Sequence, residues 1–409
     1  MSEPGAGVVI VGGGHAGGTA AALLRQYDYA GKITILGEEP IAPYQRPPLS
    51  KAWLKGEADA ESLALRPDSF YEEQSIDLRV SASVVSIQRD AKTVRLQSGE
   101  TIAYETLILA TGARARRLNV PGSDLPGVQV LRSAEDAELL KLALGPGKRL
   151  AVVGGGYIGL EAAASARALG AEAVVIEAMS RILVRSSCEA LSSFFTDYHR
   201  ARGVAFELNA VIERFEGADH VTGVRLADGR VIPCDDVVVG IGIIPNDELA
   251  RDAGLTCDNG VVVDLQARTS DPTIFAIGDV AQRPMPLYER MTRLESVANA
   301  LEQARQAAAA ITSQAAPANE VTWNWSDQYD IKLQMAGVPF DADDILIRGD
   351  PAAAKFAVFH LKGLVVRAVE AINAPAEFMA GRQLIGSQKP IDRAKLANTS
   401  VSMKEVVAG

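Results

Sequence analysis

The 409-residue chain is poor in residues that carry out chemistry on their own. It contains three cysteines and four histidines. Neither set shows a Cys-x-x-Cys pair or a metal-ligand spacing, so a zinc site and a Cys/His nucleophile are not indicated, and we predict no bound metal. Cys188, Cys234 and Cys257 are predicted to be inert, buried thiols. The chemistry is therefore expected to come from bound cofactors.

The sequence also has no excess of basic residues and no long apolar run. The net charge is −10 and the isoelectric point is about 5.1, so we expect neither nucleic acid nor an anionic membrane as partner. A run of about 20 uninterrupted apolar residues, which would span a bilayer, does not occur. The first apolar strand is expected from Val8, which leaves no room for a signal peptide, and we predict a cytoplasmic protein.

Glycine, in contrast, is arranged in two copies of the pattern Gly-x-Gly-x-x-Gly. Each copy follows an apolar segment and opens a segment rich in alanine and leucine, the order of strand, tight turn and helix in a βαβ dinucleotide-binding unit. The helix N-terminus in such a unit binds a diphosphate. The two copies predict two dinucleotides bound side by side. They are Gly12, Gly14 and Gly17, and Gly154, Gly156 and Gly159.

An acidic residue after the next strand supports each copy. Glu38 follows the apolar segment 33–36, and Glu177 follows the apolar segment 173–176. A carboxylate at this position accepts hydrogen bonds from an adenosine ribose and repels a 2′-phosphate, so we expect Glu177 to select NADH over NADPH. The alternative is a surface glutamate that closes a strand.

The length predicts two or three domains. Apolar strands that end at residues 110–112 and at Gly242 close two similar halves, which indicates one nucleotide-binding domain inserted into another. From Trp323 onward, alternating apolar and polar residues indicate antiparallel strands. We predict an α/β fold of two Rossmann-like domains and a C-terminal α+β domain, with helices over about 292–311 and 375–385. The expected divisions are 1–113, 114–245, 246–320 and 321–409.

These features together resemble the two-dinucleotide flavoprotein reductases of the glutathione-reductase structural class. The two fingerprints carry the resemblance, with Ala-Thr-Gly at 110–112, Gly-Ile-Gly-Ile-Ile-Pro-Asn at 240–246 and Ala-Ile-Gly-Asp at 276–279. Within this class the chain is similar to the ferredoxin reductases of bacterial oxygenase systems, the putidaredoxin reductase type. That similarity is carried by residues 46–51, 154–161, 293–297 and 325–329.

The absence of cysteine from one segment distinguishes the subclass. Disulfide reductases of this class carry a cysteine pair after the first βαβ unit, and flavoprotein peroxidases carry one cysteine there. The corresponding segment, residues 40–48, contains none. The resemblance therefore implies FAD and NADH as cofactors, hydride transfer to flavin N5, and release of single electrons to a [2Fe-2S] ferredoxin. That ferredoxin would supply a haem-thiolate monooxygenase or a ring-hydroxylating dioxygenase.

The resemblance also implies roles for individual residues. Lys51 and Glu161 would meet beside the flavin N5 and the nicotinamide, where a cation stabilises the charge of the reduced flavin. The alternative is a solvated lysine and a glutamate on a helix surface. The implied FAD set is Gly12, Gly14, Gly17, Glu38, Arg46, Lys51, Ala110, Thr111, Gly112, Arg132, Gly278, Asp279, Val297 and Trp325, and the implied NAD set is Gly154, Gly156, Tyr157, Ile158, Gly159, Glu177 and Gly242.

The sequence is also compatible with other functions. A rubredoxin reductase or an NADH oxidase has the same fold, and a flavin-binding signalling protein would bind the same cofactors without turnover. A basic C-terminal tail over residues 380–409 is a candidate surface for an acidic ferredoxin, and a solvated charged tail is the alternative. We expect a monomer or a weak dimer.

Overall fold

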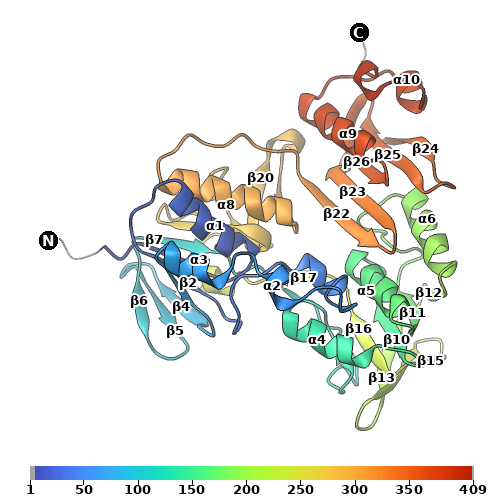
Figure 1. The fold of residues 1–409 in the computed structure, drawn as a ribbon, viewed down its shortest axis with the longest axis horizontal. Coiled ribbons are helices and arrows are strands. Elements are labelled where there is room, and N and C mark those ends of the chain that lie inside the picture. The colour runs from blue at the N-terminus through green and yellow to red at the C-terminus, as the bar shows by residue number, and fades with distance from the viewer. Residues whose placement is uncertain (1–4, 408–409) are drawn as a thin grey trace.

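A computed structural model describes residues 5–407 (Figure 1). Figure 1 shows three lobes, and each contains its own five-stranded sheet. We call them the first region, the middle region and the C-terminal region. The chain builds most of the first sheet, then the middle sheet, and returns to complete the first before it enters the C-terminal region.

The first region contains a parallel sheet with the strand order β19-β7-β1-β2-β3. Strand β1 reads Val-Val-Ile-Val and is buried along its whole length, as expected for a parallel strand covered on both faces. Helices α1 (His15–Gln26) and α8 (Val297–Ile311) lie side by side on one face. The strands are β1 (Val8–Val11), β2 (Ile33–Leu36), β3 (Ile76–Arg79), β7 (Thr106–Leu109) and β19 (Ile274–Ala276).

Two small sheets cover the other face of this sheet and share its apolar core. One is formed by β4 (Val84–Gln88), β5 (Thr93–Leu96) and β6 (Thr101–Ala103), and another by β18 (Val261–Val262), β20 (Ala281–Met285) and β21 (Arg290–Arg293). In the second of these, β18 pairs parallel with β20. The shorter helices here are η1 (Pro47–Ser50), α2 (Ala60–Leu63), α3 (Asp68–Glu73), η2 (Gly278–Val280) and η3 (Pro286–Tyr288).

The middle region repeats this plan with the strand order β12-β11-β10-β16-β9, again parallel. An antiparallel ribbon of β8 (Ala113–Ala115) and β17 (Ile243–Pro245) joins it to the first region. The sheet strands are β9 (Val128–Gln129), β10 (Arg149–Val153), β11 (Glu172–Glu177), β12 (Val204–Leu208) and β16 (Asp236–Val239). The other elements are α4 (Ala134–Ala143), α5 (Tyr157–Ala168), α6 (Glu189–Arg200), β13 (Ile212–Gly217), β14 (Val221–Leu226) and β15 (Val231–Pro233). Helix α7 (Glu248–Asp252) follows β17 and packs against β4 of the first region.

The C-terminal region is an antiparallel sheet with the order β22-β23-β26-β25-β24. Strand β22 contacts α5 of the middle region, and β24 forms the opposite edge, beside α10. The elements are β22 (Trp323–Gln328), β23 (Ile331–Gly337), β24 (Asp344–Asp350), β25 (Lys355–Lys362), β26 (Val365–Ile372), α9 (Pro375–Ser387), α10 (Arg393–Ala397) and η4 (Met403–Glu405).

The predicted fold class is confirmed: two parallel α/β sheets and a C-terminal α+β unit. The exact domain divisions stay a prediction. The predicted helix at about 375–385 is present as α9, but the one at about 292–311 begins five residues later, at Val297. Thr292 instead pairs with Arg283 in the β20–β21 hairpin, and the hydroxyl of Ser296 caps the helix by accepting the backbone N–H of Asn299.

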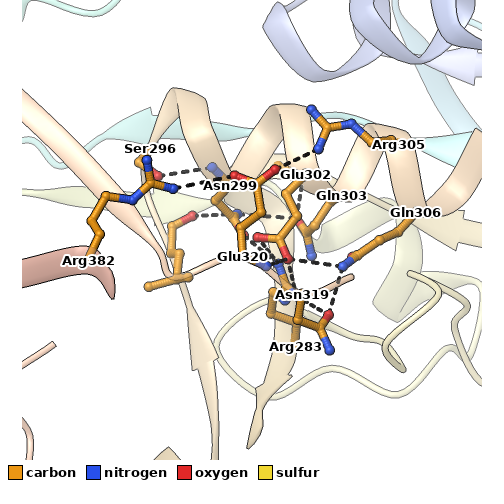
Figure 2. Close-up of polar contacts among 12 residues, drawn as sticks. Arg283, Ser296, Asn299, Glu302, Gln303, Arg305, Gln306, Asn319, Glu320 and Arg382 are labelled. Atoms are coloured by element: carbon orange, nitrogen blue, oxygen red, sulfur yellow. Dashed lines mark hydrogen bonds and ion pairs between the residues drawn. The ribbon is translucent and has the colours of Figure 1, made fainter. Parts of the chain in front are cut away.

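A buried ion pair ties the segment between α8 and β22 to the first region (Figure 2). Arg283 on β20 and Glu302 on α8 are almost fully buried and approach to 3.0 Å. The Glu302 carboxylate also accepts the backbone N–H of Glu320, while Asn319 accepts the side-chain amide of Gln306. The C-terminal region is therefore held to α8 partly through buried polar contacts.

The side chain of Glu320 extends this connection toward the C-terminal region. Its carboxylate lies 2.8 Å from Arg305 on α8 and 3.6 Å from Arg382 on α9. Both of these pairs are partly exposed, so removal of one partner costs less than it does in the buried pair beneath them.

We expect Glu302→Gln to lower the free energy of unfolding by about 3–5 kcal/mol, because it leaves the Arg283 guanidinium buried without its counter-charge. Urea denaturation followed by far-UV circular dichroism measures the change. The control is Arg305→Gln on the same helix, which breaks an exposed pair worth at most about 1 kcal/mol. Equal losses in the two variants would contradict a special role for the buried pair.

Candidate active site

The first glycine fingerprint forms a cradle between β1 and α1. Gly12 has a φ of +120°, a backbone conformation that glycine adopts without strain. A Cβ at Gly17 would lie 2.1 Å from the carbonyl oxygen of Gly12, so helix and turn can pack this closely only without a side chain. Beside Gly14, no described atom outside its chain neighbours lies within 4 Å of such a Cβ. The cradle is closed on the protein side and open above Gly14.

The second fingerprint has the same geometry between β10 and α5. Gly154 has a φ of +102°, and a Cβ at Gly159 would lie 2.3 Å from the carbonyl oxygen of Gly154. The space beside Gly156 is open in the same sense among the described residues. No described side chain caps the N-terminus of α1 or of α5. The free N–H groups of both first turns therefore suit an anionic ligand such as a diphosphate.

Glu177 lies at the mouth of the second cradle, at the end of β11. One oxygen of its carboxylate accepts the backbone N–H of Gly155 at 2.7 Å, and the other accepts that of Met179 at 2.9 Å. These bonds fix the carboxylate beside the glycine turn, where the ribose of a bound dinucleotide is expected. Ile158 is partly exposed at the start of α5, and Gly242 lies at the entry to β17 with a φ of +105°.

At the first cradle, Glu39 rather than Glu38 makes the ordered contacts. Glu38 is exposed, whereas the carboxylate of Glu39 accepts hydrogen bonds from Arg46 at 2.6 Å and from the Tyr44 hydroxyl at 2.7 Å. Burial raises the pKa of Tyr44, so its hydroxyl keeps the proton it donates. Arg46 also donates to the backbone oxygen of Arg132. The role of Glu38 in the FAD site stays a prediction.

Several residues of the predicted FAD set converge at the carboxyl ends of β7 and β19. Arg132 forms a 2.8 Å ion pair with Asp279 and donates to the backbone oxygen of Ala113. A Cβ at Gly278 would lie 3.0 Å from Ala16 of α1, next to the first cradle. The segment formed by Ala110, Thr111 and Gly112 closes β7 and is tied to Asn246 by three hydrogen bonds.

Lys51 and Glu161, 110 positions apart in the sequence, form an ion pair of 2.7 Å. Lys51 follows η1 in the first region, and Glu161 lies on α5 in the middle region. The carboxylate is 2 % exposed and the lysine side chain 17 %, so the pair lies at the boundary between protein interior and open space. The structure thus brings the two predicted catalytic residues together, while their role stays a prediction.

The hydroxyl of Tyr157, a residue of the predicted NAD set, contacts Ser187 and the C-terminal region. Its hydroxyl bonds to Ser187 at 2.7 Å and to the sulfur of Met335 on β23 at 3.0 Å. The hydroxyl end of the ring therefore lies at the contact with the C-terminal region, and a role of Tyr157 in NAD binding stays a prediction. Packing between regions decides this orientation, and the fingerprint carries no information about it.

Two residues of the implied FAD set, Val297 and Trp325, lie at the start of α8 and on β22. Val297 is the first residue of α8. Glu295 pairs with the largely buried Arg293 at 2.7 Å, and burial raises the pKa of Glu295. The rings of Trp323 and Trp325 lie 5.6 Å apart on the same face of β22.

A cluster that the sequence spacing does not reveal lies between the middle and C-terminal regions. Cys188, His360 and Glu370 place their ligand atoms within 4.8 Å of one another. The carboxylate is already engaged, because His360 lies 2.7 Å from one oxygen and Ser187 donates to the other at 2.6 Å. Burial raises the pKa of Cys188, and that of Cys234 to about 12, as expected for inert thiols.

Comparison with known proteins identifies the family. Residues 6–304 match the model of the pyridine nucleotide-disulphide oxidoreductases, and residues 323–407 match the reductase C-terminal domain. The chain belongs to the pyridine nucleotide-disulphide oxidoreductase family. The reductase is 53 % identical to the probable ferredoxin reductase CtmF of Castellaniella defragrans, over 97 % of each chain. It is 42 % identical to a rubredoxin-NAD(+) reductase of Pseudomonas putida, over 90 % of this chain and 96 % of that protein.

A solved structure agrees with these relatives. The putidaredoxin reductase in a covalent complex with putidaredoxin superposes with a TM-score of 0.95 and 41 % identity, over 98 % of this chain and 97 % of that one. FAD and NADH are the cofactors of the reductase, and the two open cradles fit two diphosphates. None of the described helices is long and apolar enough to cross a membrane.

We expect Glu177→Ala to reduce the preference for NADH over NADPH at least about tenfold, because the carboxylate no longer binds the ribose or repels a 2′-phosphate. The ratio of kcat/KM for the two nucleotides, with an artificial acceptor, measures the preference. Glu172→Ala at the exposed start of the same strand is the matched control. An unchanged ratio in Glu177→Ala would show that other residues select the nucleotide.

Proposed function

We propose that the protein is an FAD-containing NADH:ferredoxin reductase that supplies electrons to an oxygenase system through a [2Fe-2S] ferredoxin. The observation that carries this proposal is the partly buried Lys51–Glu161 pair, which lies where the first and middle regions meet. Bound FAD accepts two electrons together as a hydride and can release them one at a time. The protein binds, orients and shields the reacting groups.

The polypeptide's contribution begins with the two cradles. The N-termini of α1 and α5 bind the two diphosphates through backbone N–H groups and through the positive ends of the helix dipoles. The Arg132–Asp279 pair adds polar groups beside the first cradle. We infer that these contacts place the two ring systems against each other between the cradles.

Lys51 supplies positive charge at this junction. Glu161 holds the ammonium group through a charge-assisted bond, and Lys51 also donates to the backbone oxygen of Pro47. A fixed ammonium in a partly buried site stabilises negative charge that develops nearby more strongly than a solvated one does. We propose this as the catalytic role of the pair.

The acceptor is inferred from the absence of a sulfur relay. Residues 40–48 contain no cysteine, and Cys188, Cys234 and Cys257 are all free in the structure. Electrons therefore leave from the flavin to an external carrier. The relatives named ferredoxin reductase and the solved complex with putidaredoxin support a ferredoxin in this role. Free cysteines suit a reducing compartment, which supports a cytoplasmic location as part of the proposal. A monomer or weak dimer is a further part of it.

The basic tail does not support a docking surface at the flavin. Arg393 pairs with Asp344, and Arg382 pairs with Glu320, so two of its cations are partly neutralised. Helix α10 lies beside β24, at the sheet edge opposite the strand β22 that contacts α5. These contacts favour the alternative, in which the charges of residues 380–409 are solvated or paired within the protein.

Anaerobic titration with NADH and with NADPH, followed by visible absorbance, tests the function. We expect about one equivalent of NADH to bleach the bound flavin, because one hydride carries both electrons, and NADPH to be much less effective. Added ferredoxin, and separately rubredoxin, should then be reduced at rates that rank the two carriers. Oxygen consumption without a carrier would favour the oxidase, and a colourless protein that cannot be reconstituted with FAD would end the proposal.

We expect Lys51→Met to slow reduction of the flavin by NADH about a hundredfold at saturating NADH, because a fixed charge at the junction is lost. Anaerobic stopped-flow absorbance measures the limiting rate. Lys55→Met is the matched control, since Lys55 lies four residues away and pairs with Glu57. A limiting rate that equals the control's would remove Lys51 from the mechanism.

A further inference from the structure

The Glu161 carboxylate receives hydrogen bonds from two regions outside its own. From the first region, Ser50 and Lys51 donate to one oxygen at 2.5 and 2.7 Å. From the C-terminal region, Ser326 on β22 donates to the other oxygen at 2.6 Å. Each oxygen thus has at least one short bond to a donor outside the middle region. The position of the carboxylate is set jointly by the two neighbouring regions.

Ser326 is itself held by a buried chain of side chains. Gln328, two residues further on the same face of β22, donates from its amide nitrogen to the Ser326 oxygen at 3.1 Å. The amide oxygen of Gln328 lies 2.8 Å from Nε2 of His199, at the end of α6. All three side chains are at least 95 % buried, so water does not compete for these bonds.

These hydrogen bonds form a series that ends at the Glu161 carboxylate, and this end fixes which group donates in each bond. An ionised carboxylate only accepts, so Ser326 donates its proton to Glu161 and accepts from Gln328. The Gln328 oxygen then accepts a proton from Nε2 of His199. Burial lowers the pKa of His199 to about 4, so the ring is neutral and its one N–H is the donor at Nε2. Aligned hydrogen bonds of this kind strengthen one another in a dry interior.

We propose that Ser326 is a positioning residue for the reductase reaction: held by Gln328 and His199, it fixes the Glu161 carboxylate and thereby places the Lys51 ammonium. The C-terminal region therefore contributes to reduction of the flavin as well as to stability. This inference rests on the proposed function, because it assigns Ser326 an effect through the Lys51–Glu161 pair. No contact between Ser326 and either cofactor is required.

Ser326→Ala tests the inference in the intact FAD-bound enzyme. Without the hydroxyl, one oxygen of Glu161 loses its donor, and the carboxylate can rotate away from Lys51. We expect the limiting rate of flavin reduction at saturating NADH to fall about tenfold, while the dissociation constant of NADH changes less than about twofold. Ser326→Cys has nearly the same shape but a weak donor and should behave as alanine does, whereas Ser326→Thr keeps the hydroxyl and should restore most of the rate.

A matched control separates this effect from loss of any buried serine. Ser192 is as buried as Ser326, and its hydroxyl likewise accepts one bond, from Arg181, and donates one, to the backbone oxygen of Ile182. Ser192→Ala should therefore destabilise the fold to a similar degree and leave the limiting rate unchanged. Bound FAD and the thermal midpoint are measured for every variant.

A double-mutant cycle with Lys51→Met decides how Ser326 acts. If it acts through Lys51, adding Ser326→Ala to Lys51→Met should change the limiting rate less than about twofold. An equal tenfold fall in both backgrounds would show that Ser326 affects general packing, and would overturn the inference. A wild-type rate in Ser326→Ala would also overturn the inference. The proposed function would then still stand, because NADH would still reduce the flavin. Failure of NADH to reduce the wild-type flavin would instead refute the proposed function itself.

Discussion

The arrangement of the site depends on one buried carboxylate that needs donors from outside its own region. Glu161 lies on the helix that opens the second dinucleotide cradle, and its charge is costly to bury unless every oxygen is hydrogen-bonded. Ser50 and Lys51 satisfy one oxygen from the first region, and Ser326 satisfies the other from the C-terminal region. A rearrangement of either region would leave one oxygen of this buried carboxylate without its donor. The same contacts that stabilise the carboxylate therefore specify how the three regions fit around the site.

The two cradles follow a simpler rule, because they depend on local backbone geometry. Each requires a left-handed first glycine, an open second glycine and a third glycine packed against a carbonyl oxygen. These requirements are local and can be read from six residues. This is why the two βαβ units and their parallel sheets could be predicted from the sequence. The family followed from resemblance over several motifs, and the cofactor-binding residues stay a prediction.

What the sequence could not supply are contacts between distant segments. Glu39 rather than Glu38 is bound by Arg46, since the fold of residues 40–46 selects between two neighbouring carboxylates. The Tyr157 ring turns toward Met335, and the sequence pattern around Tyr157 carries no trace of β23. The start of α8 was misplaced because Arg290–Arg293 pairs with β20, and this tertiary pairing overrides local helix preference. The contact of Lys51 with Glu161 was anticipated from family resemblance, whereas the contribution of Ser326 and Gln328 required the fold.

Buried polar groups attach the C-terminal region at two places near its start, one just before β22 and one within β22. Before β22, the Arg283–Glu302 pair binds the backbone of Glu320, and within β22 Ser326 binds Glu161. Apolar packing alone is tolerant of small shifts, because its energy depends on area more than on direction. Hydrogen bonds to buried charges are directional, and a small displacement leaves a charge unsatisfied. Two such anchors, one on each side of Trp323 and Trp325, hold this aromatic pair in a defined place relative to α8 and α5, which is what a site assembled from three separate sheets requires.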